Sequence, residues 1–382
     1  MKVVTLNRRE LAGAVADVGV LVPIAVALMV KNGLSATAVL LPAALLYFTV
    51  ATVYKLPVPV QPLKAFGAIA IAKGLGADDI AAGALLMGAI FLALGQLRLL
   101  DLAARGFPRA LIRGVQLTVG LLFLKIAWTL VTSPSKGFKE YALSSGWALP
   151  LAMLVLVLAF ALRRWPIMLA LVGAGAIVAV VLTGDKASFG PSAISVPHLD
   201  GATFWTAFTV LVLPQVPLSF ANSCLATADA ARAYFGRLGE RVRPGRLATT
   251  FGSANLLAGA ISGMPVCHGA GGMTAHYAFG ARTAAAPAAM GALLLTLALA
   301  LGSGLAALLA AFPLPILAGV LATAGVLHIL LLRDLHRARD WAVALLVGIV
   351  GFELNLTVAL ALGLALWWLP VGVSRLPRLR TA

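Results

Sequence analysis

The chain has 382 residues, of which 61% are hydrophobic and only 11% are charged, and its formal net charge is +16. Soluble domains are roughly 45–50% apolar and about 25% charged, so this composition excludes a water-soluble globular protein. The positive charge could indicate nucleic acid, but Lys and Arg lie in short connectors between apolar runs, with no basic face interleaved with aromatic residues, so we expect no nucleic-acid partner.

The first half of the chain contains apolar runs long enough to cross the hydrocarbon core of a bilayer, which needs about 20 residues per helix. Gly, Pro and charged connectors separate these runs. The predicted spans lie near 10–30, 34–54, 60–73, 80–98, 110–132, 147–163 and 166–183. Asp17 interrupts the first run, and many spans follow it, so we interpret that run as a membrane helix and not as a signal peptide.

The second half repeats this arrangement. Its predicted spans lie near 203–227, 246–263, 267–281, 285–306, 312–331, 339–353 and 355–370, which gives about fourteen spans in an all-α membrane protein. Seven spans per half make the second half, 200–382, enter the membrane from the side opposite to the first, 1–190, as in inverted-repeat transporters. No soluble domain is expected, because only a short tail follows Pro370.

The distribution of basic residues tests the number of spans, because cytoplasmic loops are enriched in Lys and Arg. With this number, most of the 29 Lys and Arg residues fall on the side of the two termini. The opposite side receives Lys31, Lys73, Lys136, Lys139 and Lys186. The sequence therefore predicts a multi-pass protein of the inner or plasma membrane with both termini in the cytoplasm.

The third span of each half is short and follows a proline-containing break. In the first break, Pro57, Pro59 and Pro62 prevent a continuous helix, so the chain should be extended before a new helix begins. A helix N-terminus at membrane depth attracts an anion, and Gln61 and Lys64 add side-chain donors. A kinked helix whose Lys64 reaches the membrane surface is the alternative.

The second break, residues 263–272, is rich in glycine, which lets a ligand approach the backbone closely. Cys267, His268 and Gly269 lie at its centre and are candidate substrate-binding residues. His268 could equally be a structural residue. Cys224 and Cys267 form no CxxC pair, so we expect neither a disulfide framework, a metal site nor a cofactor. Paired breaks in two halves favour a binding site between them.

A third polar stretch interrupts the eighth span. Gln215, Ser219, Asn222 and Ser223 are costly in lipid unless they face protein, water or substrate. In an α-helix the last three share a face, because they are spaced at i, i+3 and i+4. Gln215 is a candidate ligand, whereas Ser219 and Asn222 are candidate site neighbours, with hydrogen bonding between helices as the alternative.

Charged residues inside spans are few. Asp17 in the first span could coordinate a driving cation, lie beside the site, or form a structural pair with Lys125 in the fifth. We expect little acidity between the two breaks, because a bound anion must be compensated by donors and positive charge.

The three polar segments together resemble the molybdate transporter family, a relative of the sulfate permease superfamily. The similar motifs are Pro-Val-Gln-Pro-Leu-Lys-Ala at 59–65, Leu-Pro-Gln-Val-Pro-Leu-Ser-Phe-Ala-Asn-Ser at 213–223, and Met-Pro-Val-Cys-His-Gly-Ala-Gly-Gly at 264–272 with the run 276–283 after it. The resemblance implies the seven-plus-seven fold of sulfate and uracil permeases, in which a core domain carries substrate between the third and tenth helices and moves against a gate domain.

The sequence therefore predicts a secondary transporter for a tetrahedral oxyanion, molybdate or sulfate, that works by alternating access and could form a homodimer. The same fold carrying another anion or a nucleobase is one alternative. An intramembrane enzyme is a second, but Asp78 and Asp79 stand alone in a connector, and His268 and His276 lack carboxylate partners.

Overall fold

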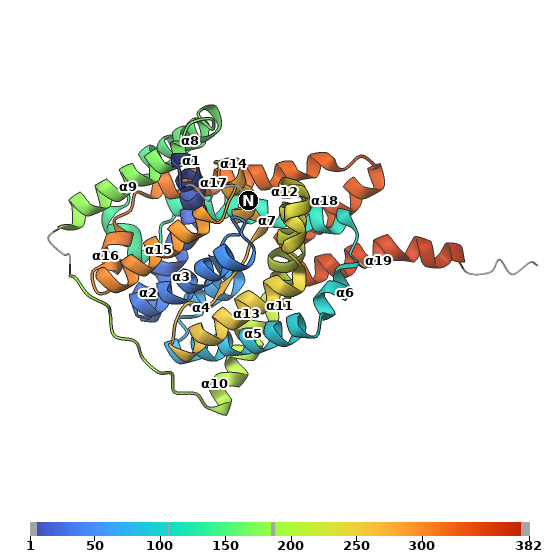
Figure 1. Cartoon of the computed structure of the whole chain (residues 1–382), viewed down its shortest axis with the longest axis horizontal. Helices are drawn as coiled ribbons and strands as arrows, with labels where there is room; N and C mark the ends of the chain where they lie inside the picture. Colours follow the sequence, from blue (N-terminus) through green and yellow to red (C-terminus); the bar gives the residue numbers. More distant parts are fainter. Residues whose placement is uncertain (1–5, 106, 185–187, 376–382) are drawn as a thin grey trace, which may run out of the picture.

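The computed structural model describes residues 6–105, 107–184 and 188–375. Lys186 and both chain ends, on which part of the predicted orientation depends, lie outside these ranges. The first half is built from helices joined by short connectors (Figure 1). Its elements are α1 (Arg8–Ala14), η1 (Val15–Asp17), α2 (Val18–Asn32), α3 (Ala36–Val53), β1 (Gln61–Pro62), α4 (Lys64–Lys73), α5 (Ala77–Gln96), α6 (Leu99–Arg105), α7 (Arg109–Thr132), η2 (Lys136–Tyr141), α8 (Ser145–Ala161) and α9 (Ile167–Thr183).

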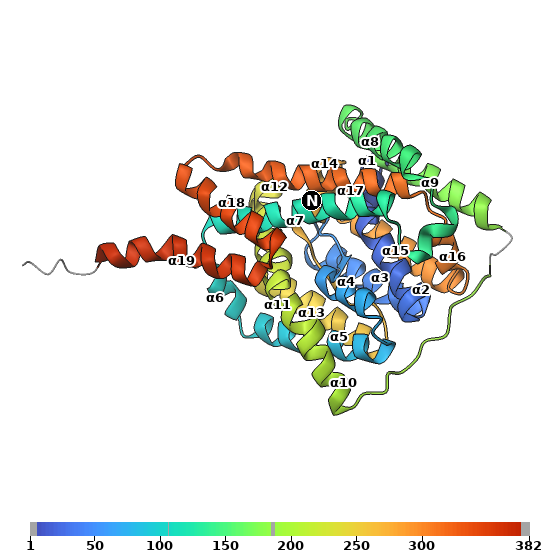
Figure 2. The same cartoon turned by 180° about the vertical axis from the view of Figure 1, so that it is seen from behind.

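The second half follows a long extended segment that crosses the surface from α9 (Figure 2). Its elements are α10 (Gly201–Thr206), η4 (Ala207–Val212), α11 (Leu213–Leu218), η5 (Ser219–Ala226), α12 (Thr227–Phe235), η6 (Gly236–Arg241), α13 (Pro244–Ala260), β2 (Val266–Cys267), α14 (Ala270–Ala278), α15 (Ala285–Ala300), α16 (Leu305–Ala310), α17 (Leu314–Ile329), η7 (Leu330–Asp334), α18 (Ala338–Glu353) and α19 (Leu356–Arg375).

Each predicted span overlaps a helix or a run of joined helices, but the spans 60–73 and 267–281 begin in extended segments. Among the described residues, six helical stretches are long and apolar enough to cross a membrane. These are Arg8–Asn32, Ala36–Val53, Ala77–Gln96, Arg109–Thr132, Gly201–Arg241 and Leu314–Asp334. The remaining predicted spans correspond to shorter helices, so the number of membrane crossings stays a prediction.

The all-helical expectation has one exception, and it lies at the two breaks. β1 and β2 pair antiparallel, with Gln61 opposite Cys267 and Pro62 opposite Val266. Leu63 N–H extends the contact by donating to Pro265 O at 3.1 Å. α4 and α14 begin shortly after the two strands, so segments about 200 residues apart in the sequence place their helix starts side by side.

The helices pack in two groups, and each group mixes both halves of the chain. In one group α13 packs along α5 and α15 along α3. In the other α17 packs along α7 and α8, while α18 packs along α7 and α19. In the first group, a Cβ at Gly88 of α5 would lie 2.9 Å from Gly252 O of α13. The small residues therefore allow close backbone contact of the kind found between membrane helices.

The surface of the helical assembly is strongly apolar. Large side chains on α8, α9 and α19 are exposed, among them Trp147, Leu154, Val181 and Trp368. In contrast, Gln61, Arg113, Gln215 and His268 are at most 1% exposed. Apolar side chains outside and polar ones inside fit a protein that faces lipid.

Candidate functional site

The extended segment before α4 is fixed by two histidines from the α14 region. His276 Nδ1 lies 3.1 Å from Pro57 O, and His268 Nδ1 lies 2.9 Å from Pro59 O. A carbonyl oxygen only accepts, so both Nδ1 atoms donate. Tyr47 O–H adds a bond to Val60 O at 3.3 Å. Because the prolines interrupt the helix, the carbonyl groups of this segment have no helical hydrogen bonds, and buried side chains donate to them instead.

The second break is fixed in the same manner by side chains of α13. The amide of Asn255 donates to Val266 O at 2.9 Å and accepts from Val266 N–H at 2.7 Å. His268 Nε2 lies 2.9 Å from Thr250 Oγ1. Both ring nitrogens of His268 therefore have partners, and its bond to Pro59 O connects the second break to the first. Cys267 Sγ adds a contact between the breaks, at 3.7 Å from Pro62 O.

Three side chains form a chain of hydrogen bonds in front of the paired breaks. Lys64 Nζ donates to Gln61 Oε1 at 2.6 Å, and Gln61 Nε2 donates to Asp17 Oδ1 at 2.5 Å. Gln61, Asp17 and Lys64 are 0%, 3% and 7% exposed. The second carboxylate oxygen of Asp17 is buried without a hydrogen-bond partner. The formal charges of the Lys64 ammonium and the Asp17 carboxylate are opposite in sign.

Two glycines of the second break make room for this cluster. A Cβ at Gly269 would lie 2.9 Å from Gln61 Cδ and 3.4 Å from Lys64 Nζ. A Cβ at Gly272 would lie 2.7 Å from both Asp17 Oδ2 and Gln61 Nε2. These positions therefore need glycine so that the side chains of the first break can approach the backbone closely.

One expectation about this site is wrong. The sequence favoured little acidity between the breaks, whereas Asp17 lies there with a partner from the first break. The alternative pairing with Lys125 is also wrong, because Lys125 is exposed and lies 5.3 Å from the centre of the Phe352 ring. The carboxylate is tolerated at this depth because Gln61 and Lys64 lie beside it.

The polar stretch of the eighth span supports the start of α4. Gln215 Oε1 accepts from Phe66 N–H at 2.9 Å, and Gln215 Nε2 donates to Ser219 Oγ at 2.9 Å. Ser219 and Asn222 are both buried, and Asn222 Oδ1 has no partner. Residues 219–226 form a π-helix, so Ser219 and Asn222 do not have the α-helical spacing that was expected to place them on one face. Gln215 occupies the Phe66 N–H group, which could otherwise face an anion.

Two residues beside the site carry no polar motif, and the sequence did not indicate them. Phe123 of α7 lies 5.6 Å from Lys64 Nζ, measured to the ring centre, and a Cβ at Gly271 would meet the same ring. His328 of α17 is fully buried, with its Nδ1 3.2 Å from Thr274 Oγ1 and its Nε2 without a partner. Both come from the second helix group, so the site lies where the two groups meet.

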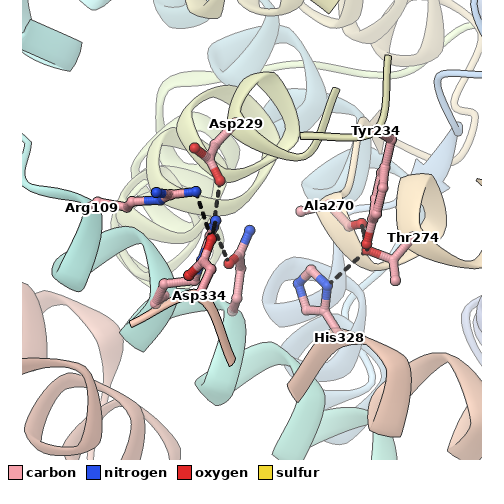
Figure 3. A network of polar contacts seen from close by, with 9 residues as sticks. Arg109, Asp229, Tyr234, Ala270, Thr274, His328 and Asp334 are labelled. Carbon is pink, nitrogen blue, oxygen red and sulfur yellow. Dashed lines mark hydrogen bonds and ion pairs between the residues drawn. The ribbon is translucent and has the colours of Figure 1, made fainter. Parts of the chain in front are cut away.

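An ion-pair network joins α7 to α12 and η7 (Figure 3). Arg113 of α7 donates from Nε to Asp334 Oδ1 at 2.9 Å, from Nη2 to Asp334 Oδ2 at 2.5 Å, and from Nη1 to Asp229 of α12. Arg109 adds a contact to Asp334 at 2.6 Å. Arg113 lies near the cytoplasmic end of the predicted span 110–132, and nothing in the sequence indicated its aspartate partners.

Comparisons with known proteins agree with this geometry. The model of a family described as molybdate transporters of the MFS superfamily matches residues 9–123 and 207–327, which contain both breaks and the cluster. The chain belongs to this molybdate transporter family. A family of transporters does not support the enzyme alternative.

The relatives of this family member cover nearly the whole chain. Molybdate transporter 1 of Arabidopsis thaliana is 27% identical over 93% of this chain and 86% of its own. Molybdate transporter 1 of Chlamydomonas reinhardtii is 26% identical over 92% of this chain and 89% of its own.

Solved structures show the fold. The transmembrane domain of the cyanobacterial bicarbonate transporter BicA superimposes with a TM-score of 0.60 at 20% identity, over 92% of this chain and 96% of its own. Murine Slc26a9, an anion transporter in the inward-facing state, gives 0.62 at 17% identity, over 98% of this chain and 70% of its own. The molybdate transporter family member thus has the fold of these anion transporters and is a multi-pass membrane protein.

Proposed function

We propose that this protein is a secondary transporter that moves a tetrahedral oxyanion, molybdate or alternatively sulfate, across the inner or plasma membrane. The observation that carries the proposal is the pairing of β1 with β2, which brings Gln61 and Lys64 of one break against Gly269 and Gly272 of the other. Amide and ammonium donors beside a glycine backbone suit an oxyanion. The names of the curated relatives support molybdate.

The anion would take the two donors that now bind within the cluster, the Gln61 amide on Asp17 and the Lys64 ammonium on Gln61. Lys64 and Gln61 supply N–H groups, while Cys267, His268 and Gly269 hold the second break beside them. Gln215, Ser219 and Asn222 would support the site without binding the anion directly, since Gln215 accepts from an N–H group at the start of α4. A dianion entering this cluster needs further positive charge, because burying uncompensated charge is costly. Asp17, whose second oxygen is unpartnered, is the position at which a coupling cation or proton would supply it.

The two helix groups suit alternating access. We place the inverted-repeat halves at 1–190 and 200–382, with both termini cytoplasmic and the protein able to act as a homodimer. Movement of the group holding α3, α5, α13 and α15 against the group holding α7, α17 and α18 would expose the site to each side in turn. Phe123 and His328 lie on the side that this movement would separate from Lys64.

A binding titration tests the proposal. Purified protein is titrated with molybdate and with sulfate, with uracil as a competitor, and the same series is run on Lys64→Ala. We expect saturable oxyanion binding that uracil does not displace and that Lys64→Ala weakens by at least about tenfold, which corresponds to about 1.4 kcal/mol. Displacement by uracil without oxyanion binding would favour a nucleobase carrier instead.

A further inference from the structure

A cavity of about 380 Å³ lies beside α8, α12, α14 and α17, apart from the cluster at the breaks. Its polar lining comes from Arg163, Arg164 and Arg282 together with Tyr234, Tyr277 and Thr274. A second hollow adjoins it, shares the three arginines and adds Arg9. On the proposed orientation this basic cavity opens toward the cytoplasm.

The basic cavity holds more positive charge than neighbouring carboxylates offset. In residues 6–105, 107–184 and 188–375, the ion pairs join Arg109 and Arg113 to aspartates, and the three cavity arginines take part in none. The carboxylate of Glu10 lies close by and accepts from the backbone N–H groups of Arg282 and Thr283. The guanidinium groups therefore face the cavity without a carboxylate partner.

Arg282 is held in place before any ligand arrives. Its guanidinium lies 3.7 Å from the centre of the Tyr277 ring and donates to Ala281 O at 2.8 Å. The Tyr277 ring stacks on Tyr234 at 4.4 Å with an interplanar angle of 13°. A fixed guanidinium loses little conformational freedom when it binds an anion, and its planar fork matches oxyanion geometry.

A polar contact joins the basic cavity to the candidate site. Tyr234 O–H donates to Thr274 Oγ1 at 3.1 Å, and Thr274 donates to Ala270 O, the first residue of α14, at 3.0 Å. His328 Nδ1 meets the same hydroxyl (Figure 3). Thr274 is thus part of the cavity wall and lies one helical turn from the start of α14, where the second break ends.

We propose that the basic cavity is a second oxyanion-binding site, at which the transported dianion binds after it leaves the central site and before it enters the cytoplasm. The inference rests on the proposed function and extends it. Arg163, Arg164 and Arg282 bind the anion, and the Tyr234–Thr274–His328 contact separates the two sites. Because the arginines are exposed at the rim, binding there is weaker than at Lys64 and more sensitive to salt.

The test is a molybdate titration of the full-length protein that counts bound anions per chain. The variants are Lys64→Ala, the triple change Arg163→Gln, Arg164→Gln and Arg282→Gln, and the matched control Arg241→Gln, an exposed arginine outside the cavity. We expect two anions per chain in the unchanged protein. Lys64→Ala should retain only the weaker, salt-sensitive anion, and the triple variant should retain only the tighter anion. Arg241→Gln should retain both anions.

The outcomes separate this inference from the proposed function. A single bound anion per chain, with an affinity that the triple variant leaves unchanged, overturns the second site and leaves the transporter proposal standing. Absence of oxyanion binding in every variant overturns both. Repeating the titration with phosphatidylglycerol added tests whether the cavity binds a lipid headgroup. If the lipid abolishes the weaker molybdate binding and leaves the tighter binding intact, the assignment of the basic cavity to the transported anion is overturned. Arg164→Gln alone, at an exposed position, serves if the triple variant is unstable.

Discussion

Gln61 donates a 2.5 Å hydrogen bond to Asp17, and so connects the first membrane helix to the break that precedes α4. The opposite end of the same amide accepts from Lys64. An amide is suited to this position because it donates to the carboxylate and accepts from the ammonium at the same time. The contacts of this cluster, and those of the ion-pair network around Arg113, lead to four predictions.

Gln61→Glu should weaken oxyanion binding by at least about tenfold, or about 1.4 kcal/mol. The new carboxylate cannot donate to Asp17, brings like charges together, and competes with the substrate for Lys64. Calorimetric titration with molybdate measures the effect. Gln96→Glu, at the exposed end of α5, is the matched control, and equal dissociation constants for the two variants would contradict the assigned role of Gln61.

Asp17→Asn should keep oxyanion binding and abolish accumulation against a gradient. The amide preserves the size of the side chain, but it removes the charge with which a coupling cation or proton would interact. Uptake and exchange are measured in proteoliposomes: exchange should persist while net uphill uptake is lost. If uphill uptake continues at the original rate, Asp17 is not the coupling position.

Gly269→Ala should reduce oxyanion affinity at least about tenfold in protein that still inserts and folds. The added Cβ would lie 2.9 Å from Gln61 Cδ, so Gln61 must leave its contacts with Asp17 and Lys64. Gly173→Ala in α9, where a Cβ meets nothing within 4 Å, is the control. An unchanged affinity in Gly269→Ala would show that the two breaks do not enclose the substrate.

Arg113→Ala should lower the free energy of unfolding by about 3 kcal/mol, since it leaves Asp229 without its arginine partner and Asp334 with Arg109 alone. Asp229→Asn should cost less, because the carboxylate of Asp334 still pairs with Arg113. Thermal unfolding of detergent-purified protein gives the comparison, with Arg241→Ala as the exposed control. Similar midpoints for Arg113→Ala and the control would mean that the network contributes nothing to the stability of the folded protein.

Much of the fold could be predicted because the bilayer imposes length and polarity on each helix. Pro57, Pro59 and Pro62 ended one helix, and the glycines of 263–272 marked the other break. Gln61, Lys64 and Gly269 were candidates by residue type alone, and the structure brings them together.

The partners of these residues could not be predicted. His268 donates to Pro59 O and Gln215 accepts from Phe66 N–H, so both residues expected to bind substrate form hydrogen bonds with the backbone. Phe123 and His328 carry no motif and approach the site only because α7 and α17 pack together.

The sequence by itself determined the membrane-embedded class, the approximate helix positions, the two breaks and the family resemblance, since all of these follow from local composition along the chain. Only the tertiary structure decided that Asp17 meets Gln61, that Arg113 is buried between aspartates, and that the adjacent arginines 163–164 line one cavity with Arg282 of a distant segment. The physical reason is that charge compensation depends on distance in space, and residues far apart in the sequence become neighbours only through helix packing.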